Sequence, residues 1–387
     1  MLQEKMIVLH TSDWHIGKKL KERDRLPEQV QALDEIAGIC EREGVEVVLV
    51  AGDVFDTYTP SADAEEVFYR AVKKIAGDKR TVVLIGGNHD DCVRLSAAAP
   101  LASENGIYIF GNRKRCFLPD SRPVRVERAG ENWLLLANQK GEKLYINALP
   151  YPNEARLGEE KTDEKYEEKI ARWIAAGEAG YEEGAYHVLL THLFVCGGLT
   201  SESERDIDLG GARVVPIDVL PKEGYVALGH LHKKQVIHGN LVYSGSILPY
   251  AFDEAGGEKG VFLLDTASNE APRFLPLESG KKLVRLECNG VEDGISLLRR
   301  YENAWIELTL HLDSPLTRAE YHALTEANEG LVSLIAKVKE QAGEGERVSR
   351  EGLSPEELFK LFYARKYGTE PNEDLTQAFL SLFSEEA

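Results

Sequence analysis

The chain has 387 residues, 43% of them hydrophobic, and its formal net charge is −19. This length favours two or three domains, and the composition indicates a globular protein with a sizeable buried core. The acidic excess argues against a protein that binds nucleic acid through its overall charge. Any contact with DNA must then come from local basic patches, bound metal ions or a partner.

The five cysteines are scattered and contain no CxxC pair, which is typical of reduced thiols in a cytosolic protein. The first residues lack the basic and apolar regions of a signal peptide. No apolar run approaches the roughly 20 residues that cross a bilayer. We therefore expect a cytoplasmic protein without membrane contact.

The first 265 or so residues alternate short apolar runs with helical stretches. Strands are expected at 6–11, 45–51 and 81–86, and helices between them at 27–43 and 62–76. This β-α-β-α-β order predicts a parallel sheet with crossover helices. Later strands are expected at 133–137, 144–149, 187–191, 225–228, 241–244 and 261–265. Because few long helices separate them, we expect antiparallel or mixed pairing there, and a four-layer αββα sandwich accommodates both halves.

A loop-like stretch at 265–283 precedes a second alternation of elements. Strands at 283–288, 305–312 and 331–338 around two helical stretches predict a small α+β domain, followed by a polar linker at 340–352. We expect three domains, at residues 1–270, 271–345 and 346–387.

The tail is expected to hold two helices. The first begins at Ser354, followed by Pro355 and two acids, and closes at Gly368; the second runs from about Asn372 to Phe383. Its apolar face carries Leu375, Ala378, Phe379, Leu382 and Phe383. Such an aromatic helix pair either packs on its own chain or binds a partner, and the sequence leaves both open.

Five short motifs follow predicted strands, where α/β proteins place their sites. They are Asp13-Trp14-His15, Gly52-Asp53, Gly87-Asn88-His89-Asp90, Thr191-His192 and Gly229-His230-Leu231-His232. Each motif alone is a weak signal, since a Gly-Asp pair is usually a turn. In a strand, alternate side chains point the same way, so each of the pairs Asp13/His15 and His230/His232 is expected to face one site.

The mixture of side chains indicates the type of metal. Imidazole, carboxylate and amide oxygen without thiolate suit Mn, Fe or Zn rather than a closed structural zinc site. Seven candidate ligands are too many for one tetrahedral ion, whereas two ions that share Asp53 would use them all. Paired ions are the arrangement for in-line displacement at phosphorus. The candidates are Asp13, His15, Asp53, Asn88, His192, His230 and His232.

The segments HTSDWHIGK, VAGDVFD, GGNHD, LLTHL and GHLH, in this order, resemble those of the calcineurin-like metallophosphoesterases. Among these, the chain resembles the SbcD family of bacterial nuclease subunits over essentially its whole length. The resemblance implies one ion on Asp13, His15, Asp53 and His232, and another on Asp53, Asn88, His192 and His230. It implies that His89 is a catalytic acid rather than a ligand, with Asp90 as its orienting partner. Asp56 stands where many relatives carry a DNA-positioning histidine, and its role stays open between that and a structural turn.

The same resemblance implies an activity and an assembly. The activity is that of a Mn²⁺-dependent 3′→5′ exonuclease on double-stranded DNA, with single-strand and hairpin endonuclease action, in DNA repair, recombination and replication. The small domain would cap the DNA groove, and the terminal helices would dock on an SbcC-type coiled-coil ATPase in a complex with two copies of each chain. Ser279-Gly280-Lys281-Lys282 matches a phosphate-binding loop only in part, so ATP hydrolysis is expected from the partner.

Two basic clusters lie beside the site motifs. Lys18 and Lys19 follow the first motif, together with Lys21, Arg23 and Arg25, and Lys233 and Lys234 follow the last. We expect Lys18, Lys19, Lys233 and Lys234 to contact the DNA backbone, with solvated loops as the alternative.

Two other functions are alternatives to a nuclease. A small-molecule phosphodiesterase would share the metal ligands but would not need a partner-binding tail. A catalytically silent scaffold for an ATPase would not need an intact ligand set.

Overall fold

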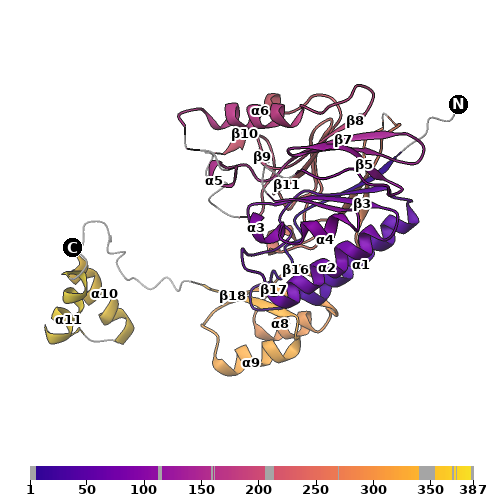
Figure 1. Cartoon of the computed structure of the whole chain (residues 1–387). Coiled ribbons are helices and arrows are strands. Elements are labelled where there is room, and N and C mark those ends of the chain that lie inside the picture. The colour runs from indigo at the N-terminus through magenta and orange to yellow at the C-terminus, as the bar shows by residue number, and fades with distance from the viewer. Residues whose placement is uncertain are drawn as a thin grey trace. The chain divides into compact units, whose positions relative to one another are not determined.

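The computed structural model describes residues 6–111, 116–157, 160, 162–204, 213–268, 270–339, 354–367, 370–371 and 373–384 (Figure 1). The chain divides into two compact units, Met1–Val338 and Lys339–Ala387. Among the described residues, no helix is long and apolar enough to cross a membrane. The first unit contains all five motifs of the predicted site.

A six-stranded sheet forms the first half of the large unit. Its central strands β1 to β4 run parallel, because α1 (Leu26–Arg42) and α2 (Ala62–Ala76) connect the first three as crossovers. The continuous Val/Leu/Ile runs of β2 and β3 are buried on both faces, as a covered parallel sheet requires. In spatial order the strands are β15 (Arg273–Pro276), β14 (Gly260–Asp265), β1 (Ile7–Thr11), β2 (Val47–Val50), β3 (Thr81–Ile85) and β4 (Ile107–Phe110).

A seven-stranded mixed sheet forms the second half, as its short connections predicted. The central strands pair in parallel and the outer ones antiparallel. In spatial order they are β12 (Gln235–His238), β13 (Leu241–Tyr243), β11 (Tyr225–Gly229), β8 (Tyr186–His192), β7 (Lys143–Leu149), β6 (Trp133–Ala137) and β5 (Arg125–Gly130). Shorter elements are α3 (Cys92–Leu95), α4 (Ala99–Ser103), α5 (Glu154–Leu157), β9 (Phe194–Val195), β10 (Val214–Val215), η1 (Ile217–Val219) and η2 (Phe252–Glu254).

The two sheets pack face to face between helices, which confirms the αββα sandwich. Val188 and Leu190 of β8 join the core that the two sheets share with α1 and α2. Leu189, between them, points the other way and packs with Ile170 and Trp173 of α6 (Tyr166–Gly177). Figure 1 shows α6 on one side of the sheets and α1 and α2 on the other.

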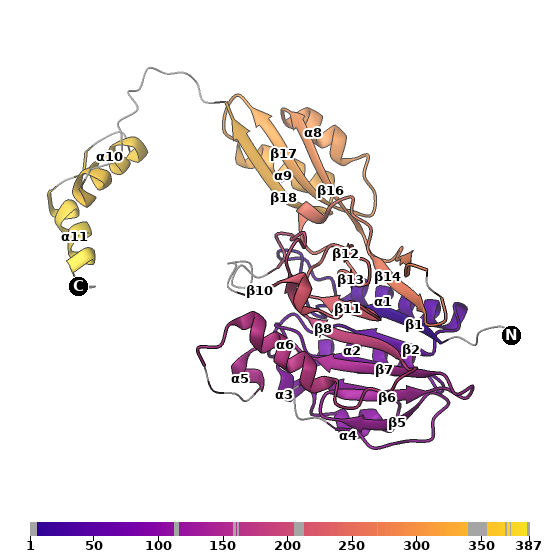
Figure 2. The same ribbon diagram turned by 90° about the horizontal axis from the view of Figure 1, so that it is seen from above.

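The small α+β domain has the three strands and two helices that its sequence predicted. β16 (Lys282–Asn289), β17 (Ala304–Leu312) and β18 (Leu331–Val338) form a parallel sheet. α8 (Val291–Leu298) and α9 (Arg318–Ala327) share its core (Figure 2). This domain belongs to the same compact unit as the sandwich.

Trp305 joins the small domain to the sandwich. Its indole Nε1 donates to Oε1 of Glu28 on α1 over 2.9 Å, and the Lys281 ammonium lies 4.2 Å from the centre of its ring. It also packs with Leu20, in the loop after the first motif, and with Phe252 of η2. The small domain therefore rests directly on segments that adjoin the predicted site.

The stretch 265–283 was predicted to be a loop, and this prediction was wrong at residues 273–276. Residues 273–276 form β15, which pairs with β14 at the edge of the large sheet. The turn residues around Ser268 gave a correct local signal, but packing of Phe274 on Phe262 extends the sheet beyond the turn. The predicted boundary at 270/271 therefore cuts through a β-hairpin.

The tail contains α10 (Pro355–Tyr367) and α11 (Glu373–Ser384), close to their predicted bounds. The two helices pack on each other, since the rings of Phe359 and Phe379 stack with centroids 4.1 Å apart. The predicted linker at 340–352, the helix-closing Gly368 and the start at Asn372 lie outside the described residues, as do the side chains of Ala378, Leu382 and Phe383.

Candidate metal centre

The seven predicted ligand residues converge at one place, where strand ends of the two sheets meet. They follow β1, β2 and β3 in the first sheet and lie at the ends of β8 and β11 in the second. All are buried, with relative exposures between 0 and 5%. A closely packed group of buried histidines, carboxylates and an amide is costly unless charge is compensated within it. The structure thus brings together every residue that the sequence nominated as a ligand: Asp13, His15, Asp53, Asn88, His192, His230 and His232.

The backbone that aims these side chains is not strand. β1 ends at Thr11, and Asp13 and His15 have positive φ angles of 51° and 45°; Asp53 and His230 follow with 48° and 102°. The expectation that strand alternation aligns Asp13 with His15, and His230 with His232, was therefore wrong in its reasoning. Left-handed residues are strained by about 1–3 kcal/mol each and concentrate at functional sites.

Hydrogen bonds between neighbouring loops hold these strained conformations. The backbone N–H groups of Asp13 and His15 donate to the carbonyls of Gly52 and Asp53, both over 3.0 Å. Gly52 itself has a φ of +86°, and a Cβ there would lie 2.5 Å from Nδ1 of His192. Glycine is therefore required before Asp53, because the loop passes so close to the imidazole.

One group of side chains surrounds His15. Its Nε2 atom lies 3.0 Å from Nε2 of His232 and 3.5 Å from Oδ2 of Asp53. Asp13, His15 and His232 each offer a ligand atom within 4.8 Å of the others. Two imidazole nitrogens this close can both face a single cation.

A second group surrounds Asn88. Its Oδ1 atom lies 2.9 Å from Nε2 of His192 and 3.1 Å from Nδ1 of His230. Nε2 of His192 is also 3.4 Å from Oδ2 of Asp53. The same carboxylate oxygen therefore lies beside both groups, at the position that a bridging ligand would need.

The protonation of the site reflects its burial. Burial raises the pKa of Asp13 to about 6 and lowers that of His230 to about 3. Burial also opposes a charged His192, but Asp53 raises the pKa of this imidazole to about 9. Donors of this kind, with no thiolate among them, fit hard or borderline divalent ions such as Mn²⁺, Fe²⁺ or Zn²⁺.

His89 lies at the edge of this centre. Its Nδ1 atom is 2.7 Å from the carbonyl oxygen of Asp56, and its ring meets that of His15 edge to face, with centroids 4.6 Å apart. Because a carbonyl only accepts, Nδ1 carries a proton. A nitrogen of His89 also lies within 4.8 Å of ligand atoms of His15 and Asp53, so a ligand role must be tested directly.

Asp56 lies between His15 and a lysine. Its Oδ1 atom is 2.8 Å from Nζ of Lys18 and 3.4 Å from Nδ1 of His15. Burial opposes its ionisation, but the histidine and the lysine hold the pKa of its carboxyl well below the ordinary value. The side chain of Asp56 thus faces the site and is not merely a residue that stabilises a turn.

The prediction that Asp90 orients His89 is wrong. The Asp90 carboxylate accepts hydrogen bonds from the backbone N–H groups of Phe55, Val54 and Gly87 over 2.8–3.1 Å. Its oxygens are thus committed to the loops that carry Asp53 and Asn88. Adjacency in the motif suggested a partner for His89, but successive side chains of this turn point in different directions.

Arg156 on α5 was missed, although it shapes the centre. Its guanidinium donates to the carbonyls of Gly87, Asn88 and Asp90, the latter two over 2.9 and 3.0 Å. It also bonds the hydroxyl of Tyr58 over 2.8 Å. A single arginine in a short helix carries no sequence signal, so only the fold reveals this clamp.

The four lysines predicted to contact DNA differ in their surroundings. Lys19 is exposed. Lys18 pairs with Asp56, Lys233 with Asp253 over 3.3 Å, and Lys234 with Glu258 over 2.7 Å. Contact of the last three with a phosphate requires exchange of these ion pairs, so the prediction is strongest for Lys19.

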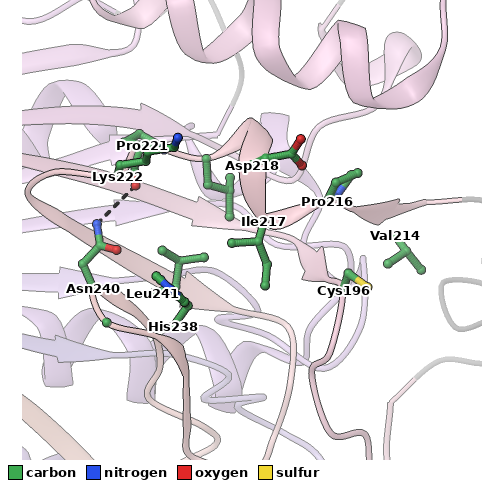
Figure 3. Close-up of a pocket in the computed structure, with 12 residues that line it drawn as sticks. Cys196, Val214, Pro216, Ile217, Asp218, Pro221, Lys222, His238, Asn240 and Leu241 are labelled. Carbon is green, nitrogen blue, oxygen red and sulfur yellow. Dashed lines mark hydrogen bonds between the residues drawn. The ribbon is translucent and has the colours of Figure 1, made fainter.

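A separate pocket of about 810 Å³ lies away from these residues. Figure 3 shows Ile217, Leu241 and Pro216 among the side chains that line it, with Asn240 bonded to the Pro221 carbonyl over 3.2 Å. None of the seven predicted ligand residues lines this pocket. We therefore assign the chemistry to the buried cluster and not to this apolar hollow.

Two regions of the chain match models of known protein families. Residues 6–234 match the family model described as calcineurin-like phosphoesterase, and residues 280–367 match the one described as type 5 capsule protein repressor C-terminal domain. The chain is 38% identical to the SbcD subunit of the nuclease SbcCD from Bacillus subtilis (strain 168), with 98% of each chain covered. It is 33% identical to the SbcD subunit from Rhodobacter capsulatus, with 81% of this chain and 82% of the relative covered.

Proposed function

Since the chain belongs to the calcineurin-like phosphoesterases and, within them, to the SbcD family of nuclease subunits, we propose that it is a Mn²⁺-dependent DNA nuclease subunit. Its proposed activities are 3′→5′ exonuclease action on duplex DNA and endonuclease action on single strands and hairpins. The chain is a metal-dependent phosphodiesterase. We propose Mn²⁺ as its metal and these two kinds of DNA cleavage as its activities.

One observation carries the proposal. Oδ2 of Asp53 lies 3.5 Å from Nε2 of His15 and 3.4 Å from Nε2 of His192, between the two groups of donors. We propose that Asp13, His15, Asp53 and His232 hold one ion, and that Asp53, Asn88, His192 and His230 hold the other. Such paired ions would activate water and offset charge on the phosphate oxygens.

The protein's own residues would position the substrate and move the proton. Nδ1 of His89 donates to the Asp56 carbonyl, so in the imidazolium form the proton on Nε2 is the one that would pass to the leaving 3′ oxygen, which leaves a neutral imidazole. Asp90 and Arg156 would act at a distance, by fixing the loops that carry Asp53, Asn88 and His89. Lys19 is the strongest candidate for a contact with the DNA backbone.

We also propose an assembly. The chain would act with an SbcC-type ATPase, and as a homodimer. The relatives, which are named as subunits of the nuclease SbcCD, support the first part. The tail offers a surface for the ATPase, because Leu358 and Leu361 of α10 remain 38% and 37% exposed although the two helices stack through Phe359 and Phe379.

A cleavage assay tests the proposal. The full chain, with and without an SbcC-type ATPase, is incubated with a 5′-labelled duplex while Mn²⁺ is titrated against Mg²⁺. We expect stepwise shortening from the 3′ end that needs Mn²⁺ and is abolished in Asp53→Asn. Hydrolysis of a cyclic nucleotide without any cleavage of DNA would instead identify a small-molecule phosphodiesterase.

A further inference from the structure

Behind His232 lies a chain of polar side chains that none of the five motifs contains. Nδ1 of His232 is 2.6 Å from Oγ of Ser203, and this hydroxyl is 2.5 Å from Oε1 of Glu254. Glu254 in turn forms an ion pair with Lys259. We propose that Ser203, Glu254 and Lys259 are positioning residues that fix the ring and the tautomer of His232 as a metal ligand. The inference rests on the two-metal centre proposed above.

The direction of the hydrogen bonds follows from which atoms can donate. Ser203 has one hydroxyl proton, and the carboxylate of Glu254, paired with Lys259, only accepts. A separation of 2.5 Å therefore requires that Ser203 donates to Glu254, which leaves the serine oxygen to accept from His232. His232 then carries its ring proton on Nδ1, and the lone pair of Nε2 points towards His15 and the proposed ion.

Lys259 pairs with Glu254 in a buried place. The lysine and the glutamate are only 8% and 3% exposed. Lys259 also donates to Oγ of Ser246 over 2.8 Å and to the carbonyl of His232 over 2.6 Å. A buried lysine with all three protons engaged is a rigid support.

The backbone of His232 is anchored from its other side as well. Its N–H donates to Oε1 of Glu204 over 2.7 Å. The residue is thus held at its amide, its carbonyl and its Nδ1 atom. His192 is also held through its Nδ1 atom, but by a backbone group, the carbonyl of Ala51, at 2.8 Å. His232 differs because side chains supply its support, so substitution can remove it.

Titration of Mn²⁺ into the metal-free full chain, followed by calorimetry, tests the inference without DNA or nuclease activity. We expect Ser203→Ala to lower the affinity for one of the two ions by about 10–100-fold and to leave the affinity for the other unchanged. Ser203→Thr retains the hydroxyl and should bind within about 3-fold of the wild type. Glu254→Gln, in which the new side chain has nearly the shape of the old one, should lower the affinity for the same ion.

Ser103 provides the control, because its hydroxyl bonds the Pro100 carbonyl of its own helix; Ser103→Ala should bind both ions as the wild type does. Wild-type affinity for both ions in Ser203→Ala and Glu254→Gln overturns the inference, and so do equal losses in Ser203→Ala and Ser203→Thr. A wild-type chain that binds fewer than two ions refutes instead the two-metal centre itself.

Discussion

The backbone N–H of His89 donates a hydrogen bond of 2.8 Å to Oδ1 of Asp53, the carboxylate whose Oδ2 lies beside both His15 and His192. The candidate acid and the candidate bridging ligand are thus joined through the main chain. This bond does not depend on the imidazole, so the side chain of His89 can be changed while Asp53 stays in place.

We therefore expect His89→Gln to retain both metal ions and to lose hydrolysis by about 10²–10⁴-fold, the usual contribution of a general acid. Elemental metal analysis and the duplex assay measure the two effects separately. His322→Gln is the control, because that side chain is exposed on α9 and pairs with Glu326 of the same helix. Loss of one equivalent of metal in His89→Gln would mean that His89 is a ligand.

Removal of metal should destabilise the sandwich. The Nε2 atoms of His15 and His232 lie 3.0 Å apart, so an ion bound by both would link the two loops that carry them. Ligand binding to the folded state adds about 2.7 kcal/mol at a hundredfold excess over Kd. We expect the melting temperature to fall with EDTA and to recover with Mn²⁺, as followed by differential scanning fluorimetry. An unchanged melting temperature would argue against tight binding at this place.

Arg156→Met should loosen the loop that carries Asn88 and His89. Its guanidinium bonds three carbonyls of that loop, and their loss leaves buried acceptors unpaired, at a cost of about 2–4 kcal/mol. Urea unfolding measures this loss, and metal titration should show weaker binding at the ion of Asn88. Arg172→Met is the control, since Arg172 lies in α6, where its guanidinium stacks over the ring of Trp173 and pairs with Glu164.

Trp305→Phe and Trp305→Ala separate two parts of the junction with the small domain. The phenylalanine removes the 2.9 Å bond to Glu28 and part of the indole but keeps an aromatic ring, and should lower stability by about 1–2 kcal/mol. The alanine also empties the contact with Leu20 and Phe252 and should lower it by about 3–5 kcal/mol. Denaturant unfolding reports both values; equal effects would show that the hydrogen bond, not the packing, holds the junction.

Lys19→Ala should weaken DNA binding without a sequence preference. If the exposed ammonium contacts one phosphate, the slope of log K against log salt should fall by about 1. Fluorescence anisotropy of a labelled duplex on the His89→Gln background gives this slope while little DNA is cleaved. Lys79→Ala, an exposed lysine after α2, should leave the slope unchanged.

The sequence by itself determined which residues meet at the site. Buried apolar runs separated by amphipathic helices specify parallel strands, and parallel strands deliver their following loops to one edge. The motifs after these strands were therefore expected to form one site, whereas the assignment of His15 and His232, 217 positions apart, to one ion came from the family resemblance. The same local patterns predicted the strands and helices of the small domain, because periodicity is a short-range property of the chain.

Only the tertiary structure decided how the site is held. Left-handed backbone at Asp13, His15 and His230 replaced the expected strand alternation, and bonds between neighbouring loops hold Asp13 and His15 in that conformation. Asp90 and Arg156 support the ligand loops through backbone atoms, which carry no residue-specific signal. β15 pairs through long-range packing that its turn-like surroundings conceal. The identity of the candidate ligands could be predicted because it depends on side-chain chemistry. Their geometry could not, because it depends on contacts between segments that are distant in the sequence.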